Sequence, residues 1–174
     1  MATKLAALCV CIVASFISPA WATDQVESAA VVESESPDLR IEPRISPRIA
    51  RRNREQIAVS FEIARERVLE VPQCSAMFTE LVAEALGTLS RVSFYPIGSH
   101  ELKPNVCDGI AVHTLVGGGP IWVCRKFSRL SDSQAAMVII HEALHHAGLT
   151  EQPHDANGIT SGAINDMVLK RCGL

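Results

Sequence analysis

The apolar residues of this chain recur three and four positions apart in four stretches. This spacing places apolar side chains on one face of a helix, and it predicts helices at residues 55–69, 75–89, 131–147 and 161–170. The third stretch begins with Ser-Asp-Ser-Gln, which has the form of a capping box at a helix start. We therefore expect helices to make up much of the folded part of the chain.

Three shorter stretches alternate apolar with polar residues or are rich in β-branched and aromatic residues. They predict strands at residues 92–97, 110–115 and 121–125, and the last two flank a glycine-rich turn that predicts a hairpin. Pro96 confines the first strand to an edge or a strand end. The expected fold class is α+β, with a small sheet of three or four strands packed on the helix at 131–147.

The first 22 residues have the composition of a secretory signal peptide. A basic start with Lys4 precedes an apolar run at residues 5–17, and Ala20-Trp21-Ala22 is typical of a cleavage site. The apolar run is too short for a membrane anchor, and no later run reaches transmembrane length. We expect a secreted or periplasmic protein that has no membrane contact after residues 1–22 are removed.

Residues 23–52 differ in composition from the rest. Residues 24–38 carry five acids and no base, and residues 40–54 carry six arginines with repeated prolines. Prolines every four residues prevent a helix, so we interpret 23–52 as a disordered linker. The alternative is a propeptide whose arginines cover the cleft of the domain. The folded domain is expected at residues 53–174.

Charge and cysteine content narrow the class of protein. Without Lys4, 15 basic and 19 acidic residues remain, and this net charge of −4 argues against nucleic acid as a partner. We expect a monomer. An even number of cysteines in an exported chain indicates two disulfides, in one of three pairings. Zinc ligation by cysteines is the competing interpretation, but no Cys-x-x-Cys pair occurs. The cysteines that follow the signal peptide are Cys74, Cys107, Cys124 and Cys172.

The predicted third helix carries the candidate chemistry. Its residues 141–145 read His-Glu-Ala-Leu-His, the metalloprotease pattern. His141 and His145 lie one helical turn apart and can point at one ion, whereas Glu142 is turned by roughly 100° and stands beside it. Gly148 suits a helix end with positive φ. The competing interpretation is a buried helix whose histidines form hydrogen bonds in the core.

The extended pattern His141-Glu142-x-x-His145-x-x-Gly148-x-x-Glu151 resembles the zincin metallopeptidases, and its spacing is similar to that of the metzincins. The last third of the chain also resembles small secreted bacterial proteins regarded as metallopeptidases. The resemblance implies a zinc ion, Zn²⁺, held by the two histidines and by a third ligand three residues after the glycine. That residue is usually His, and sometimes Asp, in the metzincins.

In this chain the third-ligand position holds Glu151. His154 and then Asp155 are the alternatives that a folded-back loop could offer. His146 is turned away from the metal-facing side of the helix by roughly 100–140°. We interpret His146 as a histidine favoured by the helix dipole, and His113 of the hairpin as structural.

The resemblance implies a secreted zinc-dependent endopeptidase that acts on peptide or protein substrates. Metal-activated water would hydrolyse the peptide bond, with Glu142 as general base. In zincins an edge strand pairs with the substrate backbone, and the predicted hairpin is a candidate for that strand. One alternative is a non-catalytic exported zinc-binding domain that binds a partner through the same cleft. Another is a hydrolase of cell-wall peptides or other amides.

Overall fold

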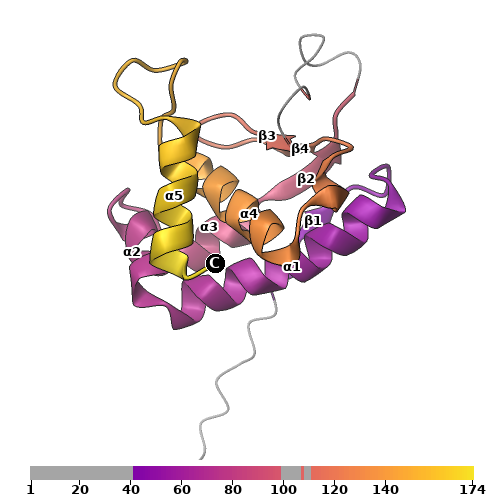
Figure 1. Cartoon of the computed structure of the whole chain (residues 1–174), viewed down its shortest axis with the longest axis horizontal. Helices are drawn as coiled ribbons and strands as arrows, with labels where there is room; N and C mark the ends of the chain where they lie inside the picture. The colour runs from indigo at the N-terminus through magenta and orange to yellow at the C-terminus, as the bar shows by residue number, and fades with distance from the viewer. Residues whose placement is uncertain (1–40, 99–106, 108–110) are drawn as a thin grey trace, which may run out of the picture. The chain divides into compact units, whose positions relative to one another are not determined.

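The structure is a computed structural model that describes residues 41–98, 107 and 111–174. The predicted signal peptide and residues 23–40 of the predicted linker lie outside this part of the chain. The described part confirms the α+β class, with five α-helices and one four-stranded sheet (Figure 1). In chain order the elements are β1 (Arg44–Ile45), α1 (Arg51–Glu70), α2 (Pro72–Thr79), α3 (Ala85–Arg91), β2 (Ser93–Pro96), β3 (Val112–His113), β4 (Ile121–Val123), the 3-10 helix η1 (Phe127–Arg129), α4 (Asp132–His146) and α5 (Ser161–Cys172).

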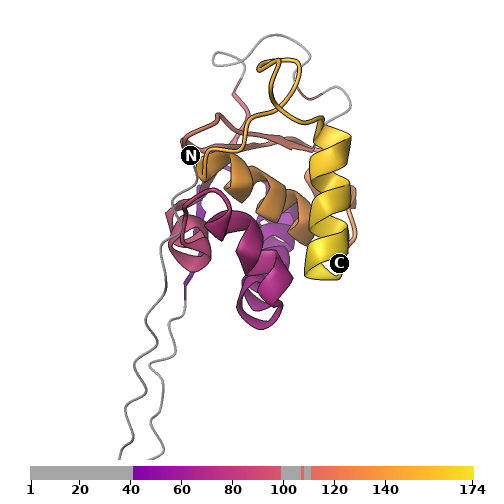
Figure 2. The same cartoon turned by 90° about the vertical axis from the view of Figure 1, so that its left-hand side faces the viewer.

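The sheet has the strand order β1-β2-β4-β3. β1 and β4 both run parallel to β2, while β3 pairs antiparallel with β4 and forms the expected hairpin. Pro96 is the last residue of β2. This end position fits an inner strand, because proline has no N–H for the hydrogen bonds between strands. α1 and α4 run beneath the sheet (Figures 1 and 2), and Phe61 of α1 meets Phe94 of β2 edge to face. The sheet therefore covers α4, the helix that bears the metal-binding pattern.

The folded part begins earlier than the boundary at residue 53 that the composition predicts. β1 pairs with β2, the Ser46 N–H donates to the Phe94 carbonyl oxygen at 2.9 Å, and Ile49 is only 2% exposed. The expectation of a disordered segment is therefore wrong for residues 41–52. Pro43 and Pro47 disfavour a helix before α1 begins at Arg51, but they permit an extended segment whose isoleucines pack against the core. β1 lies at the opposite end of the strand order from β3.

The single helix predicted at residues 75–89 is two helices. α2 ends at Thr79, and Val82 then takes a positive φ of 57° in a turn. The Glu84 side chain caps α3 by accepting hydrogen bonds from the N–H groups of Leu86 and Gly87. α2 and α3 each bury one apolar face. Their apolar residues therefore keep the helical spacing across the turn between them, and the sequence predicts one continuous helix.

α4 begins and ends as expected. The Ser131 hydroxyl accepts from the Gln134 N–H at 3.2 Å, and the Gln134 side chain accepts from the Ser131 N–H at 3.0 Å, which is a complete capping box. The helix ends before Gly148, whose φ is +104°. These local signals fix where the histidine-bearing turns of α4 lie.

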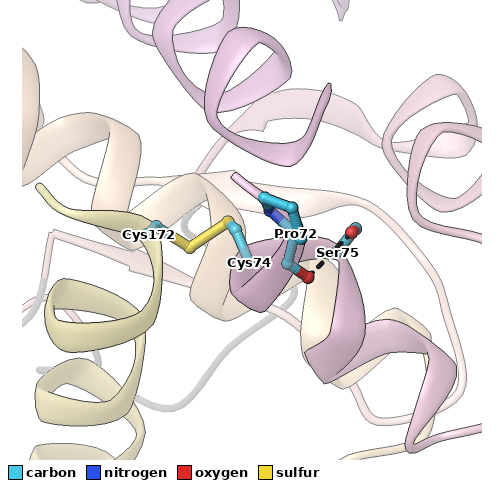
Figure 3. Close-up of a disulfide and its surroundings, with 4 residues drawn as sticks. All are labelled: Pro72, Cys74, Ser75 and Cys172. Carbon is cyan, nitrogen blue, oxygen red and sulfur yellow. Dashed lines mark hydrogen bonds between the residues drawn. A yellow bond between two sulfur atoms is a disulfide. The ribbon is translucent and has the colours of Figure 1, made fainter. Parts of the chain in front are cut away.

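Two disulfides form, and the pairing left open by the sequence is Cys74–Cys172 and Cys107–Cys124. Figure 3 shows the first bond joining α2 to the end of α5. All four cysteines are thus used in disulfides, which excludes them as metal ligands. Of the helices in the described residues, none is both long and apolar enough to cross a membrane.

Candidate metal site

α4 presents His141 and His145 on one side, one turn apart. Their Nε2 atoms lie 3.0 Å from each other, and the two residues are 5% and 4% exposed. Apolar residues of α4 at Ile139, Ile140 and Leu144 are fully or almost fully buried, so the helix is held in the core. The ligand pair is therefore mounted on a rigid element.

Glu151 reaches the histidine pair from the loop between α4 and α5. Its Oε2 atom lies 3.0 Å from Nε2 of His145 and 3.6 Å from Nε2 of His141. A short bridge to Ile159 holds the backbone of Glu151 in place. Gly158 permits this closure, because a Cβ atom there would lie 2.7 Å from the backbone nitrogen of Glu151.

Hydrogen bonds to both rings set their tautomers. Nδ1 of His141 lies 2.7 Å from Oδ1 of Asn165 in α5, and Nδ1 of His145 lies 2.7 Å from the carbonyl oxygen of Leu149. Both Nδ1 atoms therefore donate, which leaves the Nε2 lone pairs free for a metal. Burial also lowers the pKa of His141, which favours the neutral ring that a metal requires.

The sequence did not identify these supporting groups. The nearby acidic residues do not take this role: the Asp155 carboxylate accepts from the Asn157 N–H at 2.8 Å, and Asp166 is exposed. Asn165, the neighbour of Asp166, faces the site. Ile164 and Val168 form the buried face of α5. The position of Asn165 next to this face is the sequence signal that could have identified it.

The donor set fits a cation. The Nε2 atoms of the two histidines and one carboxylate oxygen of Glu151 lie within 4.8 Å of one another. With their protons on Nδ1, both rings present a lone pair to the same point as the carboxylate. Acceptors at such distances repel unless a proton or a cation lies among them. In the described part of the chain, His141, His145 and Glu151 are the one group of this kind that could hold a metal ion. His154 and Asp155 are not members of it.

Glu142 lies beside this group and is 7% exposed. Burial, with a smaller contribution from the nearby charge of Glu151, raises the pKa of the Glu142 carboxyl to about 8. The backbone N–H of Thr114, which favours the carboxylate form, opposes this increase in pKa. A divalent cation among the neighbouring ligands would favour the carboxylate form. The protonation state of Glu142 therefore depends on whether the neighbouring ligands hold a cation.

The site opens into a cavity of about 500 Å³ between α4, the β3–β4 hairpin and the loop before α5. His113 of β3 and His154 of the loop also line it. Burial and the charge of His154 lower the pKa of His113. The two histidines add to a lining in which apolar residues alternate with the polar residues of the site. Its apolar residues are Ala111, Val112, Val116, Val138 and Pro153.

No protein-family model, curated protein or solved structure matches this chain. The functional argument therefore depends on the chemistry of the site itself.

Proposed function

We propose that this chain is a zinc-dependent endopeptidase. The observation that carries the proposal is the convergence of the His141, His145 and Glu151 ligand atoms beside the buried Glu142. Two imidazoles and one carboxylate that leave a further position open are a donor set of catalytic zinc sites. A purely structural zinc site has four protein ligands and no use for an adjacent proton acceptor.

Zinc bound by the three ligands would supply a Lewis acid for the scissile carbonyl and a water that is nucleophilic at neutral pH. Glu142 would accept a proton from the attacking water and donate it to the leaving amine. Glu142 lines the cavity but is only 7% exposed, so bulk solvent competes little for that proton. Asn165 and the Leu149 carbonyl hold the two rings in the Nδ1–H tautomer, which leaves each Nε2 atom free to bind the metal.

The position of β3 supports an extended peptide as substrate. β3 is last in the strand order, and residues 111–114 line the cavity. An extended peptide can form main-chain hydrogen bonds with such an edge strand and pass the metal ligands. The cavity lining supplies small apolar side chains for contacts with neutral substrate residues.

Export of the protein is part of the proposal. The disulfides Cys74–Cys172 and Cys107–Cys124 are typical of proteins in an oxidising compartment. The signal-peptide composition of residues 1–22 supports the same location.

The test uses the purified chain without its signal peptide. We expect about one zinc per chain and casein hydrolysis that a chelator abolishes and zinc restores. Glu142→Gln should retain zinc and lower the rate by about 10²–10⁴-fold, whereas the exposed-site control Glu66→Gln should match the wild type. Zinc binding without hydrolysis would favour the non-catalytic binding domain instead.

A further inference from the structure

The turn between β3 and β4 is held against the last turn of α4 by contacts that do not involve the metal-binding side chains. The Gly117 N–H donates to the carbonyl oxygen of His145 at 2.9 Å. Nε2 of His146 lies 3.2 Å from Oγ1 of Thr114, which in turn lies 3.1 Å from the carbonyl oxygen of Pro120. Thr114 is 7% exposed, so these contacts are made in the interior.

The direction of these hydrogen bonds follows from the available protons. The Pro120 carbonyl can only accept, so the single hydroxyl proton of Thr114 is donated to it. Thr114 Oγ1 must then accept a hydrogen bond from the Nε2–H of His146. His146 therefore carries a proton at Nε2, whereas His141 and His145 carry theirs at Nδ1.

Thr114 also lies beside the candidate general base. Both residues line the cavity, and the backbone N–H of Thr114 favours the carboxylate form of Glu142 and so lowers its pKa. The main chain of Thr114 thus lies next to Glu142 on the cavity wall, while its side chain is held between His146 and Pro120. The following turn contains three glycines with positive φ and has little stiffness of its own. Its placement therefore depends on such anchoring contacts.

We infer that His146, acting through Thr114, is a positioning residue that holds the Glu142 carboxyl in its reactive place. The inference rests on the proposed function, because it takes Glu142 to be the general base. A general base must lie within hydrogen-bonding reach of the proton it removes. A misplacement of about 1 Å can cost roughly 100-fold in rate.

The first experiment removes each partner and measures kcat, KM and zinc content. Thr114→Val deletes the hydroxyl at nearly constant shape, and His146→Phe deletes the donor. Each should lower kcat by about 10- to 100-fold, with KM and zinc content close to the wild type. The double variant should lose no more than either single variant, because both act through one chain of contacts. Thr114→Ser keeps the hydroxyl, and His146→Gln keeps an N–H donor. Both variants should therefore retain a kcat much closer to that of the wild type.

Thr88→Val is the matched control. The Thr88 hydroxyl is also buried, donates to the Glu84 carbonyl oxygen at 2.7 Å and accepts from Arg91 at 3.2 Å, but it does not line the cavity. This variant should lose stability while kcat stays at the wild-type value. An unchanged kcat in Thr114→Val would overturn the inference. Losses that multiply in the double variant, or that persist at full size in a Glu142→Gln background, would overturn it as well.

Nitrogen-15 NMR of the full mature chain separates this inference from the proposed function. We expect the Nε2–H tautomer for His146, and faster hydrogen exchange of the Thr114 amide in His146→Phe and in Glu142→Gln. An Nδ1–H tautomer, or unchanged exchange in both variants, would overturn the positioning contact. If these signatures appear in a zinc-loaded protein that cleaves no peptide, the proposed function fails while the placement of Glu142 by His146 is supported.

Discussion

Asn165 supports His141 from a different helix, and its replacement tests whether the metal site depends on α5. Oδ1 of Asn165 lies 2.7 Å from Nδ1 of His141, and the histidine is 5% exposed. Asn165→Ala removes the acceptor and leaves the N–H of a buried ring without its protein partner. We expect weaker zinc binding, because the ring loses the contact that aims Nε2 at the ligand group.

The size of the effect follows from the burial of that N–H. An unpaired buried donor costs about 1–3 kcal/mol. Asn165 lines the cavity, so water can reach the vacated space and the lower part of the range applies. A bound metal requires Nε2 of His141 to stay aimed at it, whereas the metal-free ring has no such requirement, so the loss falls mainly on binding. A loss of roughly 1–2 kcal/mol raises the zinc Kd by about 5- to 30-fold.

Competition with a chromophoric chelator at constant pH measures this change in Kd. Asp166→Ala is the matched control, because Asp166 is the next residue of α5 but is exposed. It should leave the Kd unchanged. Asn165→Asp keeps an acceptor and adds negative charge, so it should bind zinc at least as tightly as the wild type. A folded Asn165→Ala variant with the wild-type Kd would refute the role of Asn165 as the orienting partner.

Three further predictions concern the ligand, the base and the fold. Glu151→Ala should raise the zinc Kd at least about tenfold; an unchanged value would move the third ligand to His154. Without zinc, the free energy of unfolding should fall as pH rises from about 4.5 to 8, because folded Glu142, with its pKa raised to about 8, keeps a proton that the unfolded chain releases. Urea unfolding should show this loss in the wild type but not in Glu142→Gln, and equal pH slopes would contradict it. Replacing Cys74 and Cys172 by alanine should lower the free energy of unfolding by about 4–5 kcal/mol, since their bond closes a loop spanning 98 residues; an unchanged urea midpoint would contradict this.

The elements with local signals could be predicted from the sequence. The capping box of Ser131 and Gln134 and the positive φ of Gly148 mark the two ends of α4, and both depend only on neighbouring residues. The β3–β4 hairpin likewise follows from two short strands around a glycine-rich turn. These features need no information from distant parts of the chain.

Two errors show where local patterns are insufficient. Residues 75–89 have one apolar period but form parts of two helices, since the turn at Val82 leaves the buried face in phase. Residues 41–52 have a linker-like composition, yet β1 pairs with β2 nearly fifty residues away. Parallel pairing of this kind depends on a long-range contact that no local period encodes.

The sequence by itself determined the spacing of His141 and His145 on one helix face and the place of Glu142 beside them, because 3.6 residues per turn is a local property. Only the tertiary structure decided that Glu151 reaches the pair, that Asn165 holds His141, and how deeply the base is buried. Those features join segments separated along the chain, and they arise only when α5, the loop before it and the hairpin close around the end of α4.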